Sequence, residues 1–326
     1  MISRLKEAIT EAKSGARDYI DFFENSGEVS GENEMLLFLK PEITAAESKF
    51  DEIANFIFDR TEIYGLYATS GFVMSGRHIK ENNLISEHYG IIDAASRSPL
   101  KAFSDAMWDS FEHTFGKKRE EVKVFGSVEY LKEHPEQNPD LLSQKWVQHG
   151  SEKLGSGVYC QHVSDEKVYL VNGFYPRLLN HFTNPESCIA CFVLRGDTPW
   201  QRARSEFVGA TAPEKAVSGS IRNTLLVKHE EYGLSEISAN QNGVHLSAGP
   251  VEGVVEIQRF SKKHENLKDL LFGRMLLETF SDSQIESILA NSSVETDTGR
   301  QSIFDLTEEC DSTAAIETIR KVLAGC

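Results

Sequence analysis

The sequence predicts an α+β protein with a split βαβ sheet, helices on one face, and further helices wrapped around it. Three observations carry this prediction. The run "EMLLFLKP" (34–41) is continuously apolar until Lys-Pro ends it, which is typical of a buried strand. The segments 62–75 and 187–196 resemble core strands in the same way. Amphipathic segments with apolar residues three or four apart lie between and after them, so strands and helices alternate.

The first elements follow in order. Residues 2–24 carry one apolar stripe and predict a helix, and "NSGEVSGEN" is a linker. After the strand at 34–41, residues 44–60 predict a helix with Phe50, Ile53 and Ile57 on one side, and 62–75 a second strand. Helical pieces are expected near 99–115 and 127–133, followed by a hairpin from "GSGVYCQHV" and "KVYLVNG".

The second half supplies the remaining elements. "YPRLLNHFT" predicts a short helix, "SCIACFVLRG" a third core strand, and "TPWQRARSEFVGA" a helix that begins at Thr198-Pro199. The segment 222–229, or one near it, is expected to form the last strand, and 250–260 a helix. Amphipathic helices are predicted at 265–280, 281–290 and 310–325.

Composition limits the classes of partner. The 326 residues include 34 Lys and Arg against 50 Asp and Glu, a formal net charge of −16. Bulk charge therefore disfavours nucleic acid and anionic membranes as partners, whereas a local cationic cluster still suits a small anion. The charged, amphipathic start does not resemble a signal peptide, and no apolar run is long enough to span a membrane. We expect a cytoplasmic protein with reduced cysteines, Cys188 and Cys191 being core thiols.

A histidine in the polar turn "NQNGVHLSAGP" raises the functional question. His245 suits a nucleophile, a metal ligand or a plain turn residue, and no second histidine stands at the helical spacing of a zinc site. Glu256, eleven residues further on, is a candidate to hold the imidazole. Lys40, Thr211 and Arg222 carry the positive charge and donors that phosphoryl transfer requires, although each also has an ordinary structural interpretation.

Several motifs together resemble the nucleoside diphosphate kinase family. They are "EMLLFLKPE", "EHY" (87–89), "FYPRLLNHF" (174–182), "VGATAPEKAVSGSIR" (208–222) and "NGVHLS" (242–247), in the family's order and spacing. The resemblance covers about 34–89 and 172–260. It implies a ferredoxin-like βαββαβ core, a ping-pong mechanism through a phosphohistidine, and a Mg²⁺-nucleotide substrate.

The resemblance also assigns residues. It implies catalytic roles for His245, Glu256 and Lys40. Nucleotide contacts are implied for Lys40, Tyr89, Phe174, Arg204, Thr211, Arg222 and Asn242, with Phe174 or Tyr175 stacking on the base. No residue is assigned to a metal, because Mg²⁺ is carried by the nucleotide phosphates.

The sequence departs from the family at four places. Ser205 stands where the family has an arginine, so we expect Arg204, or Arg202, to reach the phosphates instead. Leu246 and Ala248 replace a glycine and an aspartate after the nucleophile, and Ser218 replaces a proline. Inserts follow Tyr89 and Arg222. These changes leave two other hypotheses open. The second hypothesis is a nucleotide-binding regulatory protein without turnover. The third is another phosphotransferase, whose acceptor is held by the long insert after Tyr89.

We expect three regions: an N-terminal helix and linker (1–33), a kinase-like domain (34–260) with an insertion at about 90–171, and a C-terminal helical extension (261–326). The expected partners are nucleoside di- and triphosphates. Apolar stripes in the insertion and the extension must be buried somewhere, so a monomer or small homo-oligomer is expected in place of a hexamer.

Overall fold

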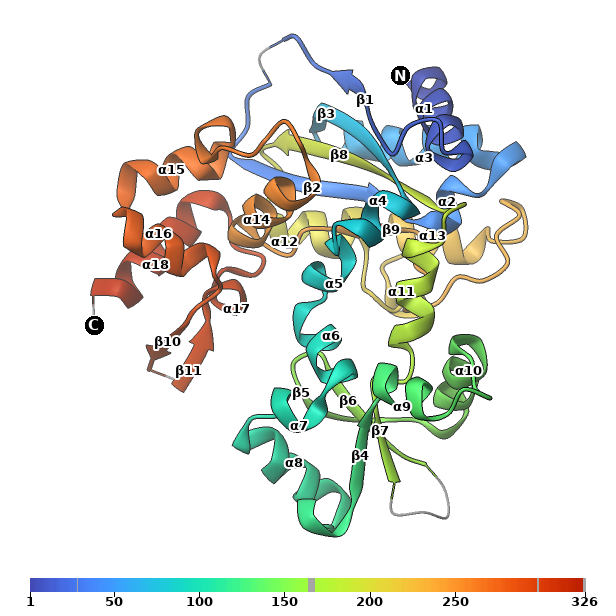
Figure 1. Ribbon diagram of the computed structural model, residues 1–326. Coiled ribbons are helices and arrows are strands. Elements are labelled where there is room, and N and C mark those ends of the chain that lie inside the picture. Colours follow the sequence, from blue (N-terminus) through green and yellow to red (C-terminus); the bar gives the residue numbers. More distant parts are fainter. Residues whose placement is uncertain (28, 164–167, 298, 325–326) are drawn as a thin grey trace. The chain divides into compact units, whose positions relative to one another are not determined.

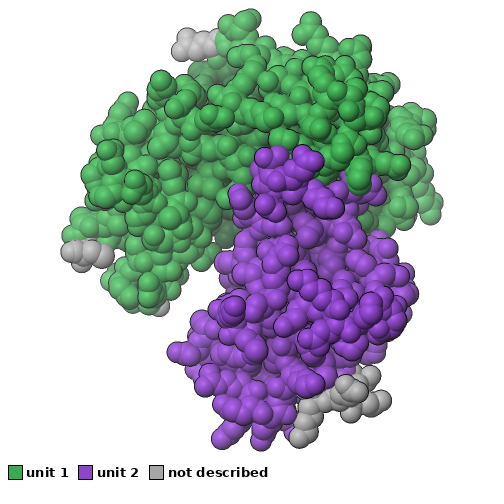
Figure 2. All heavy atoms as spheres, in the orientation of Figure 1, with its two compact units in different colours: residues 1–78, 185–326 green, residues 79–184 purple. Residues whose placement is uncertain are grey.

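The computed structural model describes residues 1–27, 29–163, 168–297 and 299–324. The chain divides into two compact units, coloured separately in Figure 2. Unit 1 comprises Met1–His78 and Pro185–Cys326, and unit 2 comprises Ile79–Asn184. Unit 2 is thus inserted into the chain of unit 1, and each unit has its own sheet.

Unit 1 is built on a five-stranded antiparallel sheet in the order β1-β3-β8-β2-β9 (Figure 1). Helix α3 (Phe50–Ile63) connects β2 to β3, and α13 (Ile221–Val227) lies between β8 and β9. The connectivity βαββαβ with the order β3-β8-β2-β9 is ferredoxin-like, so the predicted fold class is confirmed. The strands are β1 Tyr19–Glu24, β2 Asn33–Leu39, β3 Leu66–Ser75, β8 Cys188–Gly196 and β9 Val244–Leu246.

Helices cover both faces of this sheet. On one face, Leu37 of β2 belongs to a core cluster with residues of α1 (Ile2–Ser14), α3 and α13. On the other face, the ring of Phe38 lies 5.8 Å from that of Phe260, which belongs to α14 (Pro250–Phe260). Every residue of β2 is therefore buried, which explains the apolar run at 35–39; the strand begins with the buried polar residues Asn33 and Glu34.

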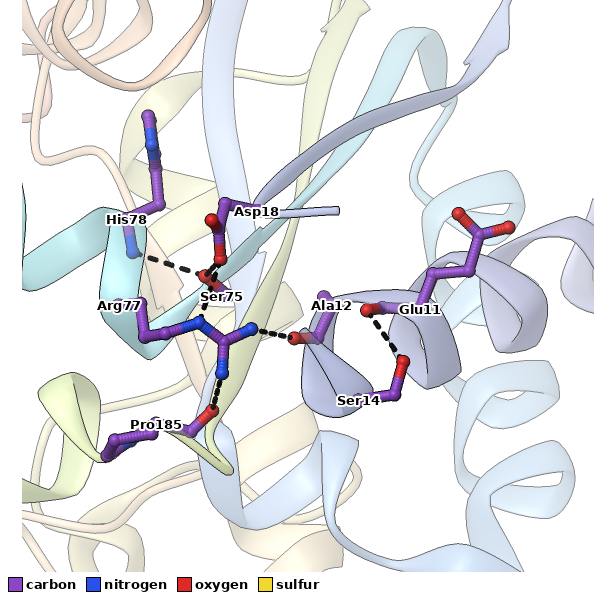
Figure 3. A network of polar contacts seen from close by, with 8 residues as sticks. All are labelled: Glu11, Ala12, Ser14, Asp18, Ser75, Arg77, His78 and Pro185. Carbon is purple, nitrogen blue, oxygen red and sulfur yellow. Dashed lines mark hydrogen bonds and ion pairs between the residues drawn. The ribbon is translucent and has the colours of Figure 1, made fainter. Parts of the chain in front are cut away.

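The predicted single helix over 2–24 is wrong. Helix α1 ends at Ser14, Gly15 follows in the left-handed region with φ 78°, and the chain continues as β1 along the edge of β3. The Arg77 guanidinium donates to the carbonyl of Ala12 at 3.1 Å and to Oδ1 of Asp18 at 3.1 Å (Figure 3). This network closes the last turn of α1, an interaction that sequence periodicity does not reveal.

The prediction that 222–229 forms the last strand is also wrong. Residues 222–227 lie in α13, which buries Ile221, Arg222 and Leu225 at helical spacing. The last strand is β9, which is only three residues long and contains His245. A run this short carries no period that a sequence pattern can detect.

Further elements complete unit 1. The predicted helix at 198–210 consists of α12 (Trp200–Arg202) and a π-helical segment, Ala203–Val208. The C-terminal extension contains an antiparallel hairpin, β10 (Ser293–Thr296) with β11 (Gly299–Ser302), that the sequence did not predict. The remaining helices are α2 Pro41–Thr44, α15 Leu271–Thr279, α16 Asp282–Leu289, α17 Ile303–Thr307 and α18 Ser312–Ala324. Helix α4 (Gly76–Glu81) contains the point in the chain at which unit 1 ends and unit 2 begins.

Unit 2 has a four-stranded sheet in the order β4-β7-β6-β5, with β4 and β7 parallel. Its strands β6 and β7 form the predicted hairpin, whose turn, 164–167, lies outside the described residues. The strands are β4 Lys123–Gly126, β5 Glu152–Gly155, β6 Val158–Val163 and β7 Val168–Val171. The helices are α5 Leu84–His88, α6 Gly90–Arg97, α7 Pro99–Ala102, α8 Asp105–Phe115, α9 Ser127–Glu133, α10 Pro139–His149 and α11 Tyr175–Thr183. None of the helices in the described ranges of either unit is both long enough and apolar enough to cross a membrane.

Candidate functional site

The short strand β9 is positioned by the glycine before it. Gly243 has φ 82°, and a Cβ on it would lie 2.3 Å from the side chain of Leu225, so only glycine fits here. Its amide donates to Glu42 at 2.8 Å, and its carbonyl accepts from the amide of Lys40 at 2.9 Å. These bonds tie the start of β9 to the end of β2 and bring Lys40 close to the strand of His245.

His245 is held by a buried carboxylate. Its Nε2 atom lies 2.9 and 3.0 Å from the two oxygens of Glu256, whose side chain is only 1% exposed. The hydroxyl of Ser247 donates to the same carboxylate at 2.6 Å. Because an ionised carboxylate only accepts hydrogen bonds, Nε2 carries a proton, and the other ring nitrogen, Nδ1, is the one suited to attack an electrophile.

The local sequence explains this arrangement. His245 and Ser247 are two residues apart on an extended segment, so their side chains leave the same face of the sheet. Helix α14 begins at Pro250, directly after this segment, and packs on that face. Its second turn delivers Glu256 to both side chains.

Two buried cations accompany the histidine. Arg222 donates to the carbonyl of Gly209 at 2.9 Å and to that of Val244, the neighbour of His245, at 3.0 Å. Lys40 is 5% exposed. Burial lowers the pKa of Lys40 to about 8; Glu42 opposes this change and Arg222 adds to it. Below that pH both side chains are positively charged.

A pocket of about 320 Å³ is lined by Arg222 and by Leu246, the neighbour of His245. Its lining combines cations with hydroxyl and glycine groups, a composition suited to an anion. Lining residues are Arg204, Ser205, Val208, Gly209, Ala210, Thr211, Lys215, Val217, Arg222, Leu246 and Glu309. The buried Asn242 donates its side-chain amide to the carbonyl of Thr211 at 3.0 Å, which links the pocket rim to the turn before His245.

Arg204, not Arg202, faces this pocket. Its guanidinium pairs with Glu308 at 2.9 Å and with Glu309 at 3.6 Å. Arg202 instead pairs with Glu206 at 3.0 Å, away from the lining residues. The hydroxyl of Ser205 donates to the carbonyl of Gln201, four residues earlier in the chain. The pocket therefore contains an arginine that is already engaged by the C-terminal extension.

A further carboxyl group lies on the first turn of α14. Burial raises the pKa of Glu252 to about 8; the neighbouring charges of Glu256 and Glu308 add to this rise, and Arg204 opposes it. The neighbourhood of Arg204 is thus rich in carboxyl groups, one of which retains its proton near neutral pH.

The other two predicted nucleotide contacts belong to unit 2. Tyr89 follows α5 and is half-buried, with its ring 4.5 Å from that of His88. Phe174 precedes α11 and packs against Trp146 and Tyr159, with ring distances of 6.1 and 6.4 Å. Seven of the predicted residues thus belong to unit 1. Arg204, Thr211 and Arg222 line the pocket, whereas Lys40, Asn242, His245 and Glu256 lie at or beside the β9 segment. Stacking of a base on Phe174 stays a prediction.

Sequence reasoning missed three contributors to the site. Ser247 was detectable, because a residue two positions from His245 shares its face in an extended segment. Glu308 and Glu309 were not detectable, since they reach Arg204 from more than a hundred positions along the chain.

No protein-family model matches the sequence, and a search of curated proteins finds no match. Solved structures that resemble the chain include nucleoside diphosphate kinases. That from Pyrobaculum aerophilum has a TM-score of 0.35 and 18% identity over 71% of this chain and 97% of that one. The enzyme from Encephalitozoon cuniculi has a TM-score of 0.34 and 14% identity, and the match covers 70% of this chain and 87% of that one. The enzyme from Borrelia burgdorferi, with bound vanadate and ADP, has a TM-score of 0.34 and 18% identity, and the match covers 72% of this chain and 89% of that one. TM-scores of this size do not establish a shared fold, so the fold assignment depends on the strand order.

Proposed function

We propose that the chain is a nucleoside diphosphate kinase-like phosphotransferase that moves the γ-phosphate of a nucleoside triphosphate to a nucleoside diphosphate through His245. The observation that supports this most directly is the contact of His245 Nε2 with the buried carboxylate of Glu256. It leaves Nδ1 as the attacking atom, on a strand beside Lys40 and Arg222. The motifs described from the sequence support the same reaction.

The proposed reaction has two symmetric halves. The lone pair of Nδ1 attacks the γ-phosphorus, the bond from phosphorus to the bridging oxygen breaks, and its electrons leave with the nucleoside diphosphate. Nε2 keeps its proton toward Glu256, so the positive charge that the ring gains faces a carboxylate. An acceptor diphosphate then attacks the phosphohistidine and restores the neutral ring. Lys40 and Arg222 would compensate the charge on the phosphate oxygens.

Mg²⁺ would accompany the nucleotide. Magnesium is usually bound through phosphate oxygens, water and one or two carboxylates. Most charged residues that line the pocket, Arg204, Lys215 and Arg222, are cationic and suit phosphates in place of a metal; Glu309 is the exception. We therefore assign the ion to the nucleotide, where it would neutralise phosphate charge, and assign no residue of this chain as its ligand.

The test is transfer of label from γ-³²P-ATP in the presence of Mg²⁺. The wild-type chain should acquire an acid-labile, base-stable label, and His245→Ala should acquire none while keeping its fold. His229→Ala is a matched control, since this half-buried histidine lies in the turn after α13, outside the site, and should label like the wild type. Labelling of His245→Ala would show that the nucleophile is another residue.

One observation favours a second function, that of a nucleotide-binding regulator without turnover. Arg204 is engaged by Glu308 and Glu309, and Ser205 adds no charge to the pocket. Under this alternative the wild-type chain would bind ADP but acquire no label. The two functions therefore separate in the same experiment once ADP binding is measured by calorimetry.

We further propose that the protein forms a monomer or a small homo-oligomer. In unit 1 the edge of β3 is paired with β1 of the same chain, so its backbone groups are already satisfied. Light scattering should give the mass of one or two chains, and a stable hexamer would contradict the proposal.

A further inference from the structure

The face of the His245 ring is covered by an aromatic side chain. Phe38 and His245 are direct partners in the β2–β9 ladder, so their side chains leave the same face of the sheet. Their rings are stacked, with centroids 4.5 Å apart and planes inclined by only 19°. Phe38 is fully buried, which leaves its ring little freedom to move.

We propose that Phe38 is a positioning residue for the nucleophile, which orients the His245 imidazole and stabilises the positive charge that the ring gains when Nδ1 is phosphorylated. The phosphorylated state in this proposal rests on the proposed function. Stabilisation of a positive charge on the ring can also be tested through protonation, in the absence of any activity.

The contact with Glu256 already limits the orientation of the ring. Both ring nitrogens lie off the axis through Cβ and Cγ, so the bond from Nε2 to Glu256 restrains rotation about that axis. Nδ1 lies farther from the axis than Nε2, so any rotation that the bond still permits displaces Nδ1 more. Stacking on Phe38 opposes this residual rotation, because tilting the imidazole would separate the two ring faces. The two contacts together determine where Nδ1 points, and an error of about 1 Å in such a position can cost about a hundredfold in rate.

The two residues that hold His245 and Phe38 in place both lie on one face of helix α14. Glu256 and Phe260 are four residues apart on α14 and therefore project from the same side of the helix. Glu256 holds the imidazole, while Phe260 packs at 5.8 Å against the ring that stacks on it. Helix α14 thus fixes His245 directly and also through Phe38.

Phosphorylation of Nδ1 gives the imidazole a positive charge. The bond from Nδ1 to phosphorus uses the nitrogen lone pair, and the electrons of the broken P–O bond leave with the diphosphate, so the imidazole gains one positive charge. The face of a phenyl ring attracts a cation. Protonation of Nδ1 places the same charge on the ring, so the protonation equilibrium of His245 reports the interaction without any nucleotide.

The test compares Phe38→Leu with Phe72→Leu. Phe72 is equally buried and faces the same side of the sheet, because both phenylalanines pair with Cys191, and its ring stacks on Tyr19. NMR titration of His245 should show protonation weakened about two- to thirtyfold in Phe38→Leu, the range expected for loss of a cation–π contact. Phe72→Leu should titrate like the wild type.

The labelling rate is the second readout. Phe38→Leu should label at least about tenfold more slowly than the wild type at saturating ATP, and the KM for ATP should change little, because the change acts on the attacking ring and leaves the phosphate contacts in place. Phe38→Tyr, which retains an aromatic ring, should keep both the His245 titration and the labelling rate close to the wild-type values. An unchanged His245 titration in Phe38→Leu, or an equal change in Phe72→Leu, would overturn the proposal. Absence of label in the wild type would contradict the proposed function alone, and the NMR comparison would still decide the role of Phe38.

Discussion

The two sides of the candidate site differ in how they are held. On the nucleophile side, His245 contacts the fully buried Glu256, which lies eleven residues further along the chain. On the pocket side, Arg204 is partly exposed and pairs with Glu308 and Glu309, which the C-terminal extension supplies.

The contacts of Glu256 are costly to break, whereas the ion pairs of Arg204 can be exchanged for other anions. Removing a buried, hydrogen-bonded carboxylate such as Glu256 leaves its partners unsatisfied, at a cost of about 1–3 kcal/mol for each group. Exposed ion pairs such as those of Arg204 contribute about 0–1 kcal/mol and compete with other anions. We therefore expect the nucleophile side to be present in every state of the protein, whereas the pocket side should depend on which anion Arg204 binds.

The largest expected effect belongs to Lys40, a buried cation beside the strand of His245. Lys40→Met should lower the labelling rate by about 10²–10³, the loss expected when one charge-assisted donor no longer stabilises the transferred group. Lys49→Met is the control, because Lys49 is exposed and pairs with Glu52 on the surface. Equal rates for the two variants would remove Lys40 from the proposed mechanism.

The nucleophile side was also the more predictable from sequence. The run at 34–41 predicted β2 because a central strand that is buried on both faces is mostly apolar, and residues 35–39 carry only apolar side chains. The interval from His245 to Glu256 predicted their pairing through the family resemblance, and the structure places the two side chains in contact. Local chain order was sufficient for both features.

Features that depend on distant contacts were not predictable. The end of α1 depends on Arg77, which comes from more than sixty residues further along the chain and donates to Ala12 (Figure 3). The acidic turn at Glu308 and Glu309 approaches Arg204 only through the packing of the extension, where the amide of Glu309 donates to the carbonyl of Ala248 at 2.9 Å. A single sequence contains no periodic or spacing signal for such contacts.

The second expected effect concerns pH. Burial lowers the pKa of Lys40 to about 8, so in the free protein the side chain is charged below that pH and neutral above it. ADP affinity should therefore fall as the pH rises through 8, by at most about tenfold per pH unit for one proton. Calorimetric titration between pH 6 and 10 measures this. Lys40→Arg should flatten the profile, because a guanidinium stays charged throughout; an identical fall in that variant would assign the titration to another group.

The smallest expected effect tests the pocket side. Replacing both Glu308 and Glu309 by Gln removes the carboxylates that hold Arg204 without changing the backbone of the turn, so Arg204 becomes available to a phosphate. Because exposed pairs are weak, the gain in affinity for ADP or tripolyphosphate should be about three- to tenfold at low salt and should shrink as salt screens the charges. Glu206→Gln is the matched control, since it releases Arg202 on the same segment but outside the pocket lining, and it should leave the affinity unchanged. A weaker affinity in the double variant would mean that Glu308 or Glu309 contacts the ligand itself, and the extension would then belong to the binding site instead of competing with the ligand for Arg204.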